Sequence, residues 1–333
     1  MPAPNLPYPP SVDLARLPTP LEPLKRLSAR LGAKILCKRD DLTGSALSGN
    51  KVRKLEFLLR DALDQGASSV ITTGGEQSNH ARATALAARQ VGLGCHLLLR
   101  TGDPSSPPPA EANILLDRLA GAEISWISPA QYADRDALMA ARAQHVATRQ
   151  GSPCYVIPEG GSNALGAWGY VRCVEEIAAA LGRVEATIVC ATGSGGTVAG
   201  LIAGCKLLHL PYRVVGVAVC DDRAYFQQRI SEILGVMSAT YGVNVATPPE
   251  GIEIWQQYVG LGYAISRDEE LACIRDLCRD EGLVTDPVYS GKALFGLLSE
   301  LETKADLPQP IIFVHTGGIY GLFPKAGQLA PLL

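Results

Sequence analysis

The sequence predicts an α/β protein built on a mostly parallel sheet that helices cover on both faces. The main observation is that short apolar runs, typical of strands, alternate with longer runs of helical periodicity from residue 34 to residue 219. Elements that alternate in this way form parallel βαβ units. The composition agrees, since 47% apolar and 19% charged residues are typical of a globular protein with a large core.

The individual elements follow from local patterns along the chain. Residues 1–20 contain many prolines and are expected to form an extended arm. Leu24, Leu27 and Leu31 recur at helical spacing, and Gly32 ends that helix. Short apolar runs predict the strands 34–38, 69–72, 95–99, 123–127, 154–157, 187–190, 213–219 and 311–314. Helical periodicity predicts the helices 51–65, 81–91, 110–119, 134–149, a segment that ends at Ala180, 198–208, 223–235 and 268–282.

Charge, cysteines and hydropathy restrict the class of protein. The net charge of -3 argues against nonspecific binding to nucleic acids. Nine cysteines occur without a Cys-x-x-Cys pair, and their spacing matches no zinc site and no disulfide framework. Cys190 and Cys220 lie in or after apolar runs, so buried free thiols in a reducing compartment are expected. We expect a cytoplasmic protein, since the sequence shows no signal-peptide pattern and no membrane-spanning run.

Lys51 is the first candidate for chemistry. It follows the flexible Gly49-Asn50 step and opens a helical run. The positive end of a helix dipole favours the neutral form of a nearby amine, and a neutral amine can attack a carbonyl group. Because most lysines are simply exposed to solvent, this interpretation depends on the loops described next.

A glycine-rich loop between a buried strand and a helix predicts a phosphate cup. It consists of Thr192, Gly193, Ser194, Gly195, Gly196 and Thr197. Its glycines let backbone N–H groups approach an anion at the helix start, and two of its hydroxyls can add donors. The loop lacks the lysine of a Walker motif, and Val198 occupies the sixth position of a dinucleotide fingerprint. A single phosphate is therefore expected, with a plain tight turn as the alternative.

Loop 74–80 also joins a strand to a helix. It carries four adjacent polar side chains, Gln77, Ser78, Asn79 and His80. One N-cap accounts for a single serine or asparagine, so an anion such as a carboxylate is expected at this helix start. Asn79 can donate to a phenolate oxygen, whereas a structural role explains His80 equally well.

Two further loops complete the set. Loop 286–292 holds Tyr289 and Ser290, and loop 315–318 holds Thr316 directly after the last strand. Ligands collect at the carboxyl ends of parallel strands, so these loops and Lys51 can converge. A phosphate cup, an activatable lysine and a donor for a ring oxygen together suggest pyridoxal phosphate.

Four motifs resemble the D-cysteine desulfhydrase and 1-aminocyclopropane-1-carboxylate deaminase family, which belongs to the tryptophan-synthase-β-like, fold type II pyridoxal-phosphate enzymes. They are Ser48-Gly49-Asn50-Lys51-x-Arg53-Lys54, Gly74-Gly75-x-Gln77-Ser78-Asn79, Thr192-Gly193-Ser194-Gly195-Gly196-Thr197 and Asp286-Pro287-Val288-Tyr289-x-Gly291-Lys292. The resemblance begins at about Leu17. It implies two open, twisted, mostly parallel sheets with helices on both faces, and a homodimer. It also implies a large cofactor-binding domain, residues 1–51 and 166–333, and a small inserted domain, residues 52–165.

The same resemblance implies roles for individual residues. Lys51 would form the Schiff base with pyridoxal phosphate, Asn79 would contact the cofactor phenolate, and loop 192–197 would hold the phosphate. Ser290 and Thr316 would also contact the cofactor. The substrate-binding residues that it implies are Gln77, Ser78, Asn79, His80, Gly161, Tyr263 and Tyr289.

Two positions distinguish members of the family. The deaminases resemble one another in having Glu after the tyrosine and Leu after the final histidine, whereas this chain has Ser290 and Thr316, as D-cysteine desulfhydrases do. It also has His80 where the deaminases typically carry Gln. A carboxylate beside the pyridine nitrogen strengthens the electron sink, which opening a cyclopropane needs more than expelling a thiolate. The pattern favours D-cysteine, with a simple capping role for Ser290 as the alternative.

The expected reaction is β-elimination from a small amino acid, with D-cysteine giving pyruvate, hydrogen sulfide and ammonia. Lys51 is expected to remove the Cα proton, Ser78 to tune or relay it, and Tyr289 to assist. L-cysteate sulfo-lyase and 1-aminocyclopropane-1-carboxylate deaminase activities are alternatives, and nearby Arg53, Lys54 and Arg82 could suit an anionic side chain. A noncatalytic protein that binds a phosphorylated ligand is the alternative from another class.

Overall fold

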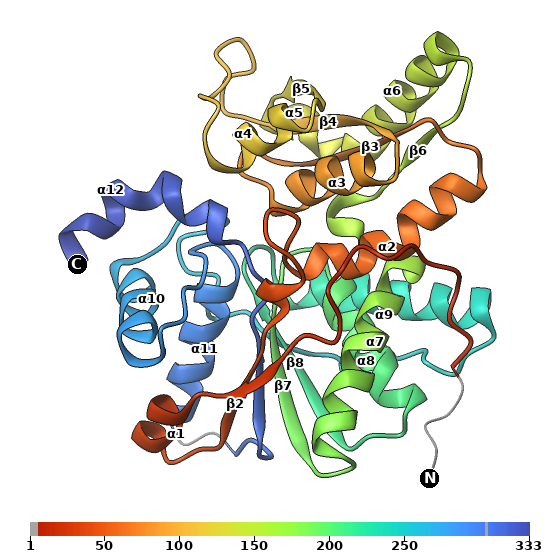
Figure 1. Cartoon of the computed structure of the whole chain (residues 1–333). Helices are drawn as coiled ribbons and strands as arrows, with labels where there is room; N and C mark the ends of the chain where they lie inside the picture. The colour runs from red at the N-terminus through yellow and green to blue at the C-terminus, as the bar shows by residue number, and fades with distance from the viewer. Residues whose placement is uncertain (1–5, 304–305) are drawn as a thin grey trace.

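A computed structural model of the chain describes residues 6–303 and 306–333 (Figure 1). Residues 1–5 of the expected N-terminal arm lie outside the described residues. The strands of the described ranges are β1 (Leu21–Pro23), β2 (Ile35–Lys38), β3 (Ser69–Gly75), β4 (Gly94–Arg100), β5 (Glu123–Ile127), β6 (Cys154–Val156), β7 (Ala186–Thr192), β8 (Tyr212–Ala218), β9 (Glu253–Trp255) and β10 (Ile311–Val314). The α-helices there are α1 (Lys25–Leu31), α2 (Asn50–Asp64), α3 (Asn79–Gln90), α4 (Ala112–Leu119), α5 (Pro129–Ala133), α6 (Arg135–Gln150), α7 (Ala164–Leu181), α8 (Gly196–Leu207), α9 (Arg223–Tyr241), α10 (Asp268–Glu281), α11 (Ser290–Glu302) and α12 (Ala326–Leu329).

These strands form two sheets, and both are mostly parallel. In the larger sheet the order is β1-β2-β10-β7-β8-β9, and β1 is the strand that runs antiparallel to its neighbour. In the smaller sheet the order is β5-β4-β3-β6, and all neighbours are parallel. The predicted fold class, two mostly parallel sheets with helices on both faces, is confirmed.

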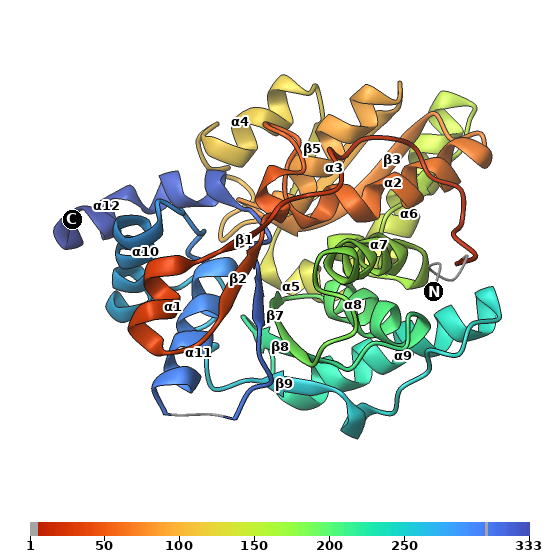
Figure 2. The same ribbon diagram turned by 60° about the horizontal axis from the view of Figure 1, so that its bottom comes forward.

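Alternating side chains of the larger sheet enter two different cores. Ile35 and Phe313 pack in one cluster with residues of α1, α10 and α11, whereas Ile312 packs in another with residues of α7 and α8. Successive residues of a strand point to opposite faces, so each face needs its own layer of helices. Figure 1 shows α1, α10 and α11 on one side of this sheet and α7, α8 and α9 on the other, and the turned view in Figure 2 agrees.

The smaller sheet is covered in the same way. Val70 and Leu97 pack with the alanine-rich α3 and with α2, whereas Ile71 and Leu98 pack with α5 and α6. Strand β3 therefore alternates between the two layers, as strands buried on both faces do. No helix of the described residues is both long enough and apolar enough to cross a membrane.

Helix α2 links the two sheets. Its Leu55 and Leu58 join the core of the smaller sheet, whereas its Phe57 packs with Trp168 of α7 on the side of the larger sheet. Figure 1 shows α2 between the two halves of the molecule. The start of α2 is therefore held at the junction, where the carboxyl ends of strands from both sheets meet. The domain boundaries given above, after residues 51 and 165, stay a prediction.

Candidate active site

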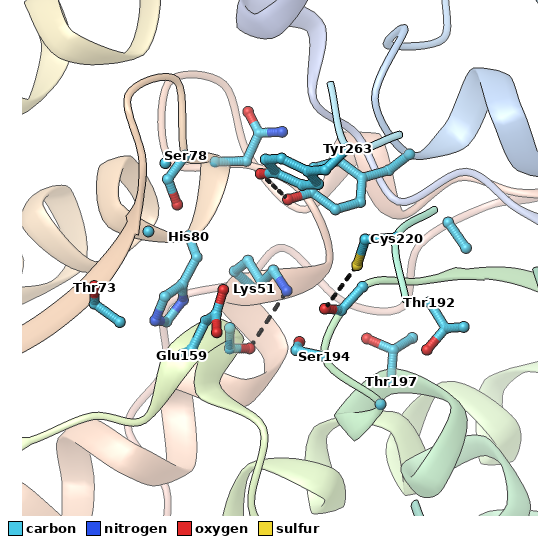
Figure 3. Close-up of a pocket in the computed structure, with 18 of the residues that line it drawn as sticks. Lys51, Thr73, Ser78, His80, Glu159, Thr192, Ser194, Thr197, Cys220 and Tyr263 are labelled. Atoms are coloured by element: carbon cyan, nitrogen blue, oxygen red, sulfur yellow. Dashed lines mark hydrogen bonds between the residues drawn. The ribbon is translucent and has the colours of Figure 1, made fainter. Parts of the chain in front are cut away.

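A cavity of about 450 Å³ lies at this junction, and it gathers the loops that the sequence singles out. Its lining comes from both sheets and from α2, and Figure 3 shows several of these side chains converging on Lys51. The predicted site residues that line it are Lys51, Ser78, Asn79, His80, Thr192, Gly193, Ser194, Gly195, Thr197, Tyr263, Tyr289 and Thr316. The predicted convergence of Lys51 with four separate loops is therefore present.

Lys51 is held in the cavity by the way its helix begins. Gly49 precedes α2 with φ 93°, a conformation that favours glycine, and a Cβ there would lie 2.8 Å from the Thr316 carbonyl oxygen. The Asn50 backbone N–H donates to the same carbonyl at 3.1 Å. These contacts fix the first turn of α2 against loop 315–318, and Lys51 Nζ lies 3.4 Å from the carbonyl oxygen of Gly160.

Burial prepares the Lys51 amine for reaction. Desolvation lowers its pKa from 10.5 to about 8, although attraction to Glu159 and Cys190 opposes the shift. From the sequence we expect the helix terminus to lower the pKa of Lys51, whereas burial of the amine is the largest cause. A lysine with this pKa is neutral in a substantial fraction of molecules at mildly alkaline pH, so it can act as a nucleophile and as a base.

Attachment of pyridoxal phosphate to Lys51 is expected to accelerate as pH rises through about 8, and then to level off. The reason is that only the neutral amine attacks the aldehyde, and a lowered pKa moves this deprotonation to lower pH. The rate of cofactor attachment to cofactor-free protein, followed by visible absorbance between roughly pH 6 and 10, measures the midpoint. A midpoint near the ordinary lysine value would contradict the assigned burial.

The glycine-rich loop has the geometry of an anion cup. It connects β7 to α8, and Gly195 has φ 81°, so the chain turns sharply before the first N–H groups of the helix. Ser194 Oγ lies 2.8 Å from Ser162 Oγ, while Thr192 Oγ1 is buried without a hydrogen-bond partner among the described residues. Gly196 is buried, and a Cβ there would lie 2.6 Å from Ser162 Oγ, so the absence of a side chain lets the loop pack closely against Ser162.

The cup and Lys51 face the same point. A Cβ placed on Gly160 would lie 2.3 Å from Ser194 Oγ and 3.1 Å from Lys51 Nζ, so both groups border the space above this glycine. Asn50 adds a direct link, because its Nδ2 donates to Thr197 Oγ1 at 3.1 Å. An amine and an anion cup in one cavity fit pyridoxal phosphate, which needs both.

The polar loop before α3 splits between two environments. Ser78 caps the helix, accepting from the Ala81 backbone N–H at 3.1 Å, and Asn79 Oδ1 accepts from Asn113 Nδ2 at 3.1 Å. Gln77 is not part of the cavity lining, because its Oε1 accepts from the Asn113 backbone N–H at 3.0 Å and its Nε2 donates to the Glu111 carbonyl oxygen. Ser78 and Asn79 therefore remain at the cavity, and Gln77 secures the loop to the start of α4.

His80 is a buried, neutral imidazole in this arrangement. Thr72 Oγ1 donates to the Ile157 carbonyl oxygen at 2.8 Å, so it must accept from His80 Nε2, also at 2.8 Å. Burial, reinforced by the positive charges of Lys51 and Lys54, holds the pKa of His80 well below its ordinary value.

Two tyrosines form one wall of the cavity. The hydroxyl oxygens of Tyr263 and Tyr289 lie 2.7 Å apart, and their rings meet at 73° with centroids 6.0 Å apart. Burial raises the pKa of the Tyr289 hydroxyl well above its ordinary value, so it remains protonated and can donate. Lys292 fixes the loop that carries Tyr263, because its Nζ donates to the carbonyl oxygens of Val259, Gly262 and Ile265 at 2.6, 2.8 and 2.9 Å.

Two predicted contact residues lie behind the cavity wall. Ser290 is fully buried, and its Oγ donates to Asp286 Oδ1 at 2.5 Å and accepts from the Asp286 backbone N–H at 2.9 Å. Gly161 packs against α2, where a Cβ would lie 3.2 Å from Leu58 Cδ1, and its neighbour Gly160 lines the cavity instead. Thr316, the other hydroxyl of the predicted pair, does line the cavity.

The cations suggested by the sequence are structural, and other cations line the cavity. Arg53 pairs with Asp40 at 2.8 Å, and Arg82 Nη1 donates to the carbonyl oxygens of Ala46 and Ser48. The side chains of Arg53, Lys54 and Arg82 are all buried.

Several charged and aromatic residues that the sequence reading missed also line the cavity. They are Arg100, Tyr132, Arg135, Glu159, Asp221 and Tyr225. Arg100 is the last residue of β4 and Glu159 lies shortly after β6, and these places at strand ends are a signal that could have found them, whereas Tyr132 and Arg135 lie in helices whose pattern gives none.

Comparisons with known proteins show which proteins this chain is similar to. The family model described as pyridoxal-phosphate dependent enzyme matches residues 12–317. The chain is 42% identical to the bifunctional D-cysteine desulfhydrase/1-aminocyclopropane-1-carboxylate deaminase of Arabidopsis thaliana, covering 96% of this chain and 81% of the relative. It is 41% identical to D-cysteine desulfhydrase of Yersinia pestis, covering 96% and 97%. A crystal structure of an ACC deaminase homologue superposes with TM-score 0.89 at 38% identity, covering 98% and 97%.

Proposed function

The chain belongs to the family of pyridoxal-phosphate-dependent enzymes, and from this premise we propose that it eliminates the β-substituent of a small amino acid, with D-cysteine as substrate. The reaction consumes one water and gives pyruvate, hydrogen sulfide and ammonia. The family membership sets aside the noncatalytic alternative, because the chain is a pyridoxal-phosphate-dependent lyase.

Each cavity group has a role in this proposal. Pyridoxal phosphate, when bound, supplies an aldehyde that condenses with amines and a ring that withdraws electrons from Cα. Loop 192–197 would grip its phosphate, and Asn79 would donate to its phenolate oxygen. Lys51 Nζ would hold the cofactor covalently and then, once released, accept the Cα proton of the substrate. The pKa of about 8 supports this second role, since the amine can lose and regain a proton near neutral pH.

The remaining residues would hold the substrate. Ser78 lies at the N-terminus of α3, where backbone N–H groups favour the substrate carboxylate. Tyr289, kept protonated by burial and joined to Tyr263, would face the β-substituent and assist its departure. His80 would border the same space as a neutral group.

The choice of D-cysteine rests on the hydroxyl group of Thr316, which lies where loop 315–318 borders the cavity. Ser290 lies directly behind Thr316, with its Oγ 3.3 Å from the Gly317 carbonyl oxygen. Among the described residues, the carboxylates in the cavity lining are Glu159 and Asp221, from other loops. A hydroxyl partner suits expulsion of a thiolate better than opening of a cyclopropane ring. L-cysteate and 1-aminocyclopropane-1-carboxylate are the competing substrates.

A screen of oxo-acid release tests this proposal. The purified protein loaded with pyridoxal phosphate is expected to release pyruvate from D-cysteine, with hydrogen sulfide in equal amount, faster than it releases pyruvate from L-cysteine or L-cysteate, or 2-oxobutanoate from 1-aminocyclopropane-1-carboxylate. The reason is that the electron sink in this cavity needs a good leaving group. Turnover of the cyclopropane substrate alone, which yields a different oxo acid, would overturn the choice.

The proposal extends to assembly and location. We expect a homodimer in the cytoplasm with a small domain, residues 52–165, inserted into a large one, residues 1–51 and 166–333.

A further inference from the structure

Arg100 lies at the cavity wall with its charge available to a ligand. It is the last residue of β4, and it pairs across the sheet with Gly75, which leads into the loop of Ser78. No carboxylate of the described residues forms an ion pair with it. Arg135, the neighbouring cation of the lining, is different, because its Nε lies 2.9 Å from Glu159 Oε2.

Two aromatic rings hold the Arg100 guanidinium in place. Its Cζ lies 4.5 Å from the centroid of Tyr132 and 5.5 Å from that of Tyr263. Cation–π contacts of this kind fix a guanidinium without using its N–H donors or neutralising its charge. Since Tyr263 is also joined to Tyr289, the guanidinium adjoins the wall that faces the substrate.

Because Gly75 has no side chain, the Arg100 guanidinium remains accessible from the cavity. A Cβ placed there would lie 3.5 Å from Tyr263 Cε1, 3.8 Å from the Tyr263 hydroxyl and 3.9 Å from Arg100 Nη2. The hydroxyl and the guanidinium therefore border the same small space, beside the loop that carries Ser78. A group of a few atoms in that space would meet an N–H donor, a positive charge and a phenol.

We propose that Arg100 determines substrate class by receiving a negatively charged β-substituent, so that amino acids with an anionic group at Cβ, a thiolate or a sulfonate, are preferred over those with a neutral one. This inference rests on the proposed function and refines it. The guanidinium would bind the thiolate form of cysteine, whose thiol has an ordinary pKa of about 8.5. The protonated Tyr289 hydroxyl would then donate a proton to the sulfur, so that the group departs as hydrosulfide, and water would reprotonate the tyrosine. The alternative cations, Arg53, Lys54 and Arg82, do not line the cavity.

The test compares substrates that share the amino acid core and differ in the charge at Cβ. In Arg100→Met, kcat/KM for D-cysteine is expected to fall roughly 10- to 100-fold, the loss typical of one charged hydrogen bond, while kcat/KM for β-chloro-D-alanine changes less than about threefold. Arg100→Lys keeps the charge and is expected to retain part of the discrimination. Circular dichroism of each variant establishes that it is folded.

Arg135→Met is the matched control, since it removes a cation of the same cavity that is already paired. It is expected to affect both substrates by the same factor. Equal losses for both substrates in Arg100→Met would overturn the inference, because they would mean that Arg100 binds the common carboxylate or only supports Tyr263. Wild-type protein that releases pyruvate from neither substrate would instead refute the proposed function.

Discussion

Replacing Lys51 by alanine is expected to abolish covalent attachment of pyridoxal phosphate and to lower kcat/KM for D-cysteine by at least about 1000-fold. The variant loses the amine that the cavity surrounds and that would both hold the cofactor and accept the Cα proton. Its small side chain leaves the neighbouring contacts of Asn50 and Gly49 intact, so folding should persist. Absorbance after borohydride reduction and dialysis measures attachment, and pyruvate release measures turnover.

Two controls separate chemistry from charge. Lys51→Arg keeps a cation at the site but cannot form an imine with an aldehyde, so it is expected to behave like Lys51→Ala. Lys25→Ala removes an exposed lysine of α1 and is expected to match the wild type. Turnover at the parental rate by Lys51→Ala, with cofactor still bound covalently, would refute the assignment.

Replacing Arg53 by methionine is expected to lower the free energy of unfolding by about 3–5 kcal/mol, the cost of leaving a buried charge without its partner. Arg53 and Asp40 are both fully buried, and Arg53 Nη2 lies 2.8 Å from Asp40 Oδ1. Arg53 also binds Glu176 at 2.8 Å, while Tyr170 donates to Asp40 at 2.6 Å. Denaturant unfolding of the variant measures the loss, and Arg16→Met, an exposed arginine, is the control with an expected change below about 0.5 kcal/mol.

The loss should also depend on pH. Burial opposes ionisation of Asp40, but the attraction of Arg53 outweighs it and holds the pKa of the carboxyl below its ordinary value of 3.8. A carboxyl with a depressed pKa contributes stability above that ordinary value, and the contribution disappears as pH falls through the folded-state pKa. The difference between wild type and Arg53→Met is therefore expected to be largest near neutral pH and to shrink in acid. A difference independent of pH would contradict the role of Asp40.

The sequence predicts most of the fold because the strands of both sheets are buried on two faces. Runs such as 187–190 are then almost entirely apolar and are separated by segments of helical periodicity, which is the clearest pattern that an α/β chain offers. Most of the elements that were not predicted, β1, β9, α5 and α12, have three to five residues, too few to establish a period, whereas α11 (Ser290–Glu302) is a longer helix that was also missed. Their structure depends on neighbours, as β1 depends on its antiparallel pairing with β2.

The candidate site is predictable at the level of loops and less so at the level of side chains. Loops that follow parallel strands converge by topology, so Lys51 and loop 192–197 could be placed together in advance. Which side of a loop faces the cavity depends on contacts far away in the sequence: Gln77 turns toward α4, and Ser290 turns toward Asp286. Arg100 escaped notice because its environment is made by Tyr132 and Tyr263, which are distant in the chain.

The central claim is that Lys51, and not another buried lysine, holds pyridoxal phosphate. Lys54 is the natural competitor, because burial also lowers its pKa well below the ordinary value, but it bonds to Gly160 and Ser162 and does not line the cavity. Borohydride reduction of the loaded protein, followed by peptide fragmentation in a mass spectrometer, locates the reduced cofactor. We predict a single label on Lys51, and a label on Lys54 or on any other lysine would contradict this account.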